Sequence, residues 1–168
     1  STIILFIVGV ILHLIHKYTA QIPVIRLFTP VNESVFEHIK LAVFPLIVWW
    51  IVFYIINKSK FNLDRNKWLL SCVVAVIISI LTIPSFHYLF INLTGEESVI
   101  FDIALLYRSL FISQMIAFKV YEHKRGINYM FSIMILIIIA ISFAILTLCP
   151  PHTPIFKDTE ANTYGLNK

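Results

Sequence analysis

The chain has 168 residues, of which 59% are hydrophobic and 13% are charged. A soluble domain of this length could not bury that much apolar surface, so the composition excludes a soluble globular protein and indicates a membrane protein. The net charge is +4. Because basic residues in membrane proteins mostly report orientation, this charge does not predict a nucleic-acid partner, and none is expected.

Hydropathy predicts a single transmembrane bundle over residues 1–151. About 20 apolar helical residues, at 1.5 Å each, cross the roughly 30 Å of hydrocarbon in a bilayer. We therefore expect an all-α fold, a polytopic membrane helix bundle, with spans at about residues 2–16, 32–56, 68–90, 95–124 and 128–148. The first stretch has no basic leader and no small-residue cleavage site, so it is predicted to be a retained helix rather than a signal peptide.

Two local signals predict helix ends. The segment from Thr94 to Glu97 resembles a capping box, with Thr94 as N-cap of the fourth span and Glu97 at its third helical position. Cys149-Pro150-Pro151 ends the fifth span, since proline cannot continue a helix. The polar tail that follows, residues 152–168, is too short to be a domain, and we expect it to fold back as a lid.

Lysine and arginine residues predict the orientation. They gather in the connection 57–67 and in the segment 119–125, which lie on one side of a bundle with five spans. Short loops rich in these residues stay in the cytoplasm. The N-terminus is then inside, the tail is outside, and the protein is a multi-pass protein of the cell membrane.

With this orientation the ionisable residues are distributed unevenly. Every acidic residue except Asp64 and Glu122, and every histidine except His123, falls at or near the outer surface. Ionisable residues in membrane helices are costly and usually functional. The sequence therefore predicts a site at the extracytoplasmic end of the bundle.

The segment Asn32–Lys40, NESVFEHIK, is the strongest candidate for that site. In a helix beginning near Asn32, residues spaced by three and four share one face. Two carboxylates on that face repel each other unless a proton, a metal, Lys40 or Arg108 lies between them. The candidate catalytic residues are Glu33, Ser34, Glu37 and His38. In a structural alternative, Asn32 and Glu33 cap the helix, Ser34 bonds to the backbone, and Glu37 and His38 form an interhelical pair.

A metal and a metal-free site are both compatible with these residues. Zinc takes about four nitrogen, oxygen or sulfur ligands, and the candidates are His13, His16, His38, His87 and Asp102. Without a metal, a carboxylate and a histidine would act as general base while Arg108 holds an anionic group of the substrate. The candidate substrate-binding residues are Asn32, Arg108, His152, Asp158 and Tyr164.

Two motifs resemble those of a family of small bacterial membrane proteins of unknown function. The first is NES-x-aromatic-EH-x-K, matched by Asn32–Lys40, and the second is PPxxPxFxD followed by YG, matched between Pro150 and Gly165. The resemblance covers nearly the whole chain. It implies a small polytopic membrane protein and no particular activity.

Ser34 and His38 also have the Ser-x-x-x-His spacing of the alkaline ceramidase and progestin-receptor-like membrane hydrolases. That similarity implies a zinc ion beside the helix. The chain departs from the pattern because it has five expected spans instead of seven and lacks the C-terminal HxxxH pair.

Three functions follow as expectations. The first is a membrane-embedded hydrolase or acyl-transfer enzyme acting on a lipid or lipid-linked substrate of the cell envelope. The second is a transporter or binding subunit for a small solute, an ion or protons, although such sites favour the bilayer midplane. The third is a structural, accessory or immunity protein whose polar cluster holds the bundle together.

Overall fold

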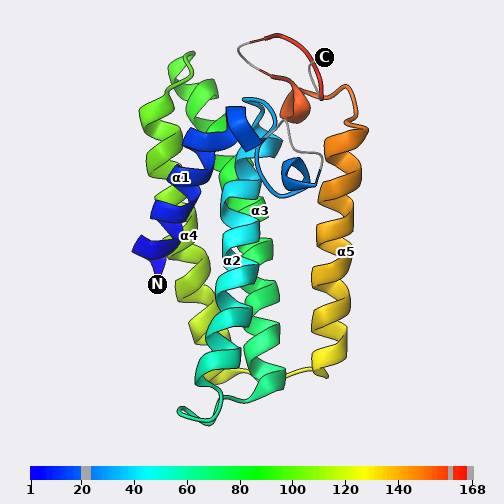
Figure 1. Ribbon diagram of the computed structural model, residues 1–168. Helices are drawn as coiled ribbons and strands as arrows, with labels where there is room; N and C mark the ends of the chain where they lie inside the picture. The colour runs from blue at the N-terminus through cyan, green and yellow to red at the C-terminus, as the bar shows by residue number, and fades with distance from the viewer. Residues whose placement is uncertain (20–23, 159–160, 166–168) are drawn as a thin grey trace.

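The computed structural model describes residues 1–19, 24–158 and 161–165, with the backbone alone for residues 16–19 (Figure 1). These residues form an all-α fold, as the sequence predicts. Its elements are α1 (Thr2–Thr19), the short 3-10 helix η1 (Ile25–Leu27), α2 (Val35–Asn57), α3 (Arg65–Thr94), α4 (Val99–His123), α5 (Tyr129–Leu148) and a second 3-10 helix, η2 (Pro154–Phe156).

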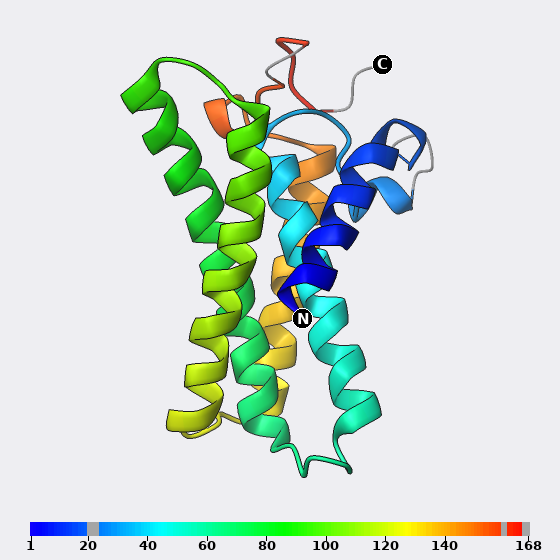
Figure 2. The same ribbon diagram turned by 90° about the vertical axis from the view of Figure 1, so that its left-hand side faces the viewer.

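Within the described residues, four helices are long and apolar enough to cross a membrane, namely α2, α3, α4 and α5. This indicates a membrane protein. The apolar part of α1, Thr2–Ile15, is shorter than the roughly 20 residues that a span requires. Helix α1 leans obliquely against the bundle and begins partway along it (Figure 2). The structure therefore does not confirm a fifth span.

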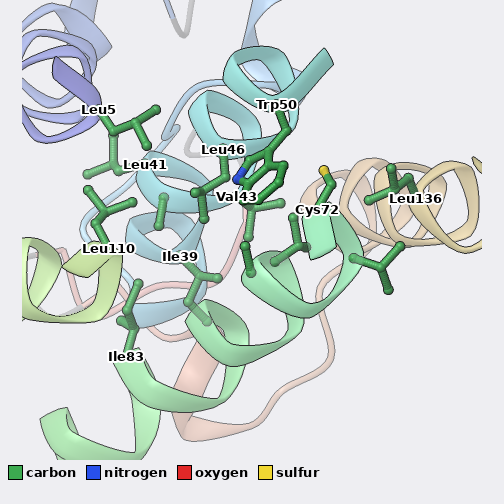
Figure 3. Packing of buried hydrophobic residues seen from close by; sticks show 14 of the residues in the cluster. Leu5, Ile39, Leu41, Val43, Leu46, Trp50, Cys72, Ile83, Leu110 and Leu136 are labelled. Atoms are coloured by element: carbon green, nitrogen blue, oxygen red, sulfur yellow. The ribbon is translucent and has the colours of Figure 1, made fainter. Parts of the chain in front are cut away.

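Helix α3 is central to the bundle, where it packs against α2, α4 and α5, while α1 packs against α2 and α4. The core lies between these helices. Figure 3 shows Val43 and Leu46 of α2, Cys72 of α3 and Leu110 of α4 in one buried cluster. Burial of such side chains in a bilayer rests on close packing rather than on removal from water.

Polar side chains cap the four long helices. Ser34, Asp64, Ser98 and Asn128 each accept a hydrogen bond from a backbone N–H in the first turn of α2, α3, α4 and α5. Each cap satisfies a donor that would otherwise have no partner in the helix. Helix α2 consequently begins after Ser34 and not near Asn32.

The predicted capping box at Thr94 is wrong. Thr94 is the last residue of α3, and its hydroxyl donates to the carbonyl of Phe90 at 2.9 Å. Gly95 ends α3 with a left-handed φ of 77°, so the chain turns before α4 can begin. The cap belongs to Ser98, which leaves Glu97 outside the helix and free of the capping role.

The basic connections between α2 and α3 and between α4 and α5 lie at the same end of the bundle (Figure 1). At the opposite end, the C-terminal tail folds back over the beginning of α2. There Asn32 donates to the carbonyl oxygen of Gly165 at 2.9 Å, and the rings of Phe36 and Phe156 lie 4.6 Å apart. The tail therefore covers the segment that the sequence selects as the candidate site.

Replacing Gly165 with alanine should release this tail. Gly165 has φ +72°, and a Cβ atom there would lie 2.8 Å from Cγ of Pro150. The left-handed backbone alone costs a residue with a Cβ about 1–2 kcal/mol, and the clash adds to it. We expect trypsin to cleave after the exposed Lys157 faster in G165A than in the wild type.

Gly95→Ala is the matched control for this prediction. Gly95 has φ +77° but no atom within 4 Å of an added Cβ, so that variant carries the backbone strain without the clash. It should leave cleavage after Lys157 unchanged. Equal cleavage rates in G165A and in the wild type would show that the contact of Gly165 with Pro150 does not hold the tail.

Candidate functional site

A cavity of about 650 Å³ lies between α1, α2, α3 and α4, near the end where α2 begins and α3 ends. Most of its wall is apolar, with contributions from Val10, Leu14, Val35, Leu41, Ile83, Val99, Ile103, Leu105 and Leu106. The ionisable residues in the wall are His13, Glu33, His38, His87, Glu97 and Asp102. An apolar cavity with a few convergent polar groups is typical of a binding or active site.

His38 and Glu33 face each other in this cavity. The Nε2 atom of His38 lies 3.3 Å from a carboxylate oxygen of Glu33, and its Nδ1 atom lies 3.0 Å from the carbonyl oxygen of Ser34. The carbonyl can only accept, so Nδ1 carries the proton and donates it. A neutral ring would then present the lone pair of Nε2 to the carboxylate, and a second proton or a metal between the two groups would make this contact favourable.

His13 completes a cluster with these two residues. Its ring centroid lies 5.3 Å from that of His38, and the ligand atoms of His13, Glu33 and His38 all lie within 4.8 Å of one another. Ligands of a tetrahedral zinc are about 3.4 Å apart, given bonds of 2.0–2.1 Å. Imidazole nitrogens and a carboxylate oxygen are ligands that zinc uses, so the cluster could hold a metal ion.

His87 and Asp102 form a second pair in the same cavity. Nδ1 of His87 lies 2.8 Å from Oδ1 of Asp102, which joins α3 to the first turn of α4. The carboxylate holds the proton on Nδ1 and leaves Nε2 to accept another. Among the described residues, these two do not belong to the metal-ligand cluster, although the sequence grouped them with it.

Glu37 is buried on a different side of α2. Nζ of Lys40 lies 2.6 Å from its carboxylate, and the side chains of the two residues are 3% and 0% exposed. The backbone N–H of Val31 also donates to Glu37 at 3.0 Å. The hydroxyl of Thr147, which donates to the carbonyl of Phe143 at 2.8 Å, lies 3.5 Å from the other carboxylate oxygen of Glu37. Lys40 donates in turn to the carbonyl oxygens of Arg26 and Thr29. This network connects α2 to α5 and to the segment that precedes α2. Glu37 does not line the cavity.

Asn32 and Ser34 have backbone partners. The side-chain oxygen of Asn32 accepts from the N–H of Ser34 at 3.0 Å, and its amide holds Gly165. The hydroxyl of Ser34 accepts from the N–H of Glu37 as the helix cap. Both side chains therefore stabilise the backbone at the start of α2 and are not free to act in the cavity.

The remaining candidates lie elsewhere. Arg108 is exposed on α4 and is not part of the cavity wall. His152 is exposed and packs edge-on against Tyr164, with ring centroids 4.8 Å apart. Asp158 is buried and accepts from the N–H of Ala161 at 2.9 Å, which closes the tail loop. The side chain of His16 lies outside the described part of the structure.

Sequence reasoning missed two residues, one in the cavity wall and one beside the buried Glu37. It assigned Glu97 to a helix cap, whereas Glu97 lines the cavity. It also missed Thr147, which reaches Glu37 from a residue 110 positions away. No local pattern points to Thr147, because an isolated threonine near a helix end is common and its partner is set by packing.

The chain belongs to a family of unknown function, DUF6512, which matches residues 1–166. This confirms the expectation of such a family, while the motifs and the similarity to the ceramidase-like hydrolases are unconfirmed. The chain matches no curated protein and no solved structure. The assignment of a function therefore depends on the chemistry of the site.

Proposed function

We propose that the protein is a metal-dependent enzyme, of the hydrolase or acyl-transfer type, that acts on a lipid or lipid-linked substrate within the membrane. The observation that carries this proposal is the convergence of His13, Glu33 and His38 on a cavity that also holds the His87–Asp102 pair. Two histidines and one glutamate form a donor set used by catalytic zinc, with a fourth position open to water.

A zinc ion bound by His13, Glu33 and His38 would polarise a carbonyl or phosphoryl oxygen of the substrate and lower the pKa of a bound water. The chain supplies the rest of the chemistry. The carbonyl of Ser34 fixes the ring of His38 through Nδ1, which keeps Nε2 directed at the cluster. His87, held by Asp102, has Nε2 available to take a proton from the attacking group and to return it to the leaving group.

The cavity wall supports an amphipathic substrate. Leu14, Leu41 and Leu106 provide apolar contacts beside the ionisable cluster, an arrangement that suits an acyl chain next to a polar linkage. The cluster lies at the end of the bundle opposite to the basic connections. Because short basic loops stay in the cytoplasm, we propose that the site faces the extracytoplasmic side of the cell membrane.

The proposal predicts that Asp102→Asn impairs turnover while metal binding persists. Without the carboxylate, the ring of His87 loses its orientation and its tautomer, and loss of a positioned general base typically costs 10²–10⁴-fold in rate. The measurement is lipid consumption by the zinc-loaded protein in vesicles, followed by mass spectrometry of ester-, amide- and phosphate-linked lipids.

Glu96→Gln is the control for Asp102→Asn. Glu96 is exposed and does not line the cavity, so the rate should not change. Loss of bound zinc in D102N would show that Asp102 is a zinc ligand, which would contradict its assignment as the residue that orients His87. A zinc-loaded protein that consumes none of these lipids would overturn the proposed function.

A further inference from the structure

A second cavity, of about 760 Å³, lies between α2, α3 and α5. The rings of Phe36 and Phe143 stack at 4.9 Å where α2 and α5 meet near the covered end. Toward the basic end α5 lies apart from α2 (Figure 1). The groove runs between them from Phe28 and Phe44 to that end. Its wall consists of Phe28, Phe44, Ile47, Val48, Ile51, Tyr54, Ile55, Lys58, Arg65, Leu69, Ile133, Leu136, Ile137 and Ala140.

The wall of the groove is apolar along its length. Ile51 and Ile55 from α2 and Ile137 from α5 line it and are 39%, 63% and 52% exposed. In water such a surface would be unfavourable, but helices α2 and α5 are both long and apolar enough to cross a membrane. In a bilayer the groove would therefore open to hydrocarbon, where it could take an apolar chain between α2 and α5.

The basic end of the groove carries two cations. Lys58 follows α2 and Arg65 begins α3, so both lie where the helices leave the membrane. The guanidinium of Arg65 lies 3.5 Å from the ring centroid of Tyr129, which fixes its position beside the groove. No carboxylate among the described residues forms an ion pair with Lys58 or Arg65.

We propose that this groove binds an anionic phospholipid, with one acyl chain between α2 and α5 and the phosphate against Lys58 and Arg65. Arginine and lysine at a membrane interface attract anionic headgroups, and basic pockets between membrane helices bind such lipids. The charge of the groove mouth selects an anionic lipid over a zwitterionic one. The basic mouth of the groove lies at the opposite end of the bundle from the His13–Glu33–His38 cluster, and none of these three residues lines the groove. This site therefore does not depend on the proposed enzymatic function.

The test compares phosphatidylglycerol with phosphatidylcholine of the same acyl chains, using native mass spectrometry of the full-length protein in detergent. Each basic residue near the surface contributes about 1 kcal/mol to binding of an anionic lipid. The double variant K58Q/R65Q should therefore bind phosphatidylglycerol about 30-fold more weakly, which corresponds to about 2 kcal/mol. Its affinity for phosphatidylcholine should stay the same.

Two further comparisons separate this site from general charge effects. The control K60Q/K124Q removes the same charge from the same end of the bundle but outside the groove wall, and it should retain the preference for phosphatidylglycerol. Ala140→Phe fills the groove and should weaken binding of both lipids. Ile141→Phe, on an exposed neighbouring position of α5, should not.

Several results would overturn the proposal. These are equal binding of the two lipids by the wild type, an unchanged preference in K58Q/R65Q, or equal losses in the two charge variants. A dimer of the wild type that Ala140→Phe disrupts would instead make the groove an interface between copies of the chain. If K58Q/R65Q does not fold, Lys58→Gln alone should still lose several-fold in affinity for phosphatidylglycerol, and an unchanged affinity there would be equally decisive.

Discussion

Replacing Glu37 with alanine will lower the free energy of unfolding by about 3–5 kcal/mol, the range typical of breaking a buried ion pair. The variant leaves the ammonium of Lys40, whose side chain is fully buried, without its carboxylate. It also removes the acceptor for the N–H of Val31. The measurement is equilibrium unfolding of the purified protein in detergent.

The double variant Glu37→Leu with Lys40→Met separates the ion pair from its surroundings. Because it removes both charges and keeps apolar volume, it should be more stable than E37A, as is often found when both partners of a buried pair are replaced. A loss below about 1 kcal/mol in E37A would contradict the structural role of Glu37. Such a result would return Glu37 to the candidate catalytic residues.

Alanine at His13 or His38 will weaken zinc binding by at least about 100-fold. Loss of a partner that merely orients a ligand typically costs 10–100-fold in metal affinity, and these residues would supply the ligand atoms themselves. Glu33→Ala should have a comparable effect, because its carboxylate faces Nε2 of His38. Competition titration of the purified protein against a zinc chelator measures the affinity.

His152→Ala is the control for the zinc titrations. His152 is exposed, packs on Tyr164 and lies outside the cavity wall, so its loss should leave zinc affinity unchanged. Equal zinc affinity in the wild type and in H13A, E33A and H38A would show that these three residues do not form a metal centre. A loss in His87→Ala as large as in His38→Ala would place His87 among the ligands, as the sequence grouping suggested.

The fold follows from hydropathy because long apolar runs can be satisfied in a bilayer only as helices. The predicted span 128–148 is nearly the observed α5, Tyr129–Leu148. Helix α3, Arg65–Thr94, is longer than the predicted span 68–90. Hydropathy detects its apolar part, whereas the cap at Asp64 and the turn at Gly95 set its ends.

The start of α4 shows why local capping signals are ambiguous. Thr94 and Ser98 are both good N-cap residues within one turn of each other, and the sequence alone favours Thr94 because Glu97 completes a capping box. The continuation of α3 to Thr94 decides between them. This same shift leaves Glu97 in the cavity wall, whereas the sequence assigned it to the cap.

The sequence identified the segment in which the candidate site lies but not the pairing of its residues. The sequence selected the segment with Glu33, Glu37 and His38 and named Lys40 as a partner for a carboxylate. It placed both glutamates on one helical face, but Glu33 precedes the cap at Ser34, so helical spacing does not apply to it. The glutamates therefore face different partners, His38 for Glu33 and Lys40 for Glu37.

Anomalous diffraction at the zinc absorption edge from zinc-loaded crystals tests the central claim, a metal centre at His13, Glu33 and His38, most directly. The account predicts one strong peak per chain between these three side chains, with ligand distances of about 2.0–2.2 Å. No peak at that position, or a single peak at another set of residues, would contradict it.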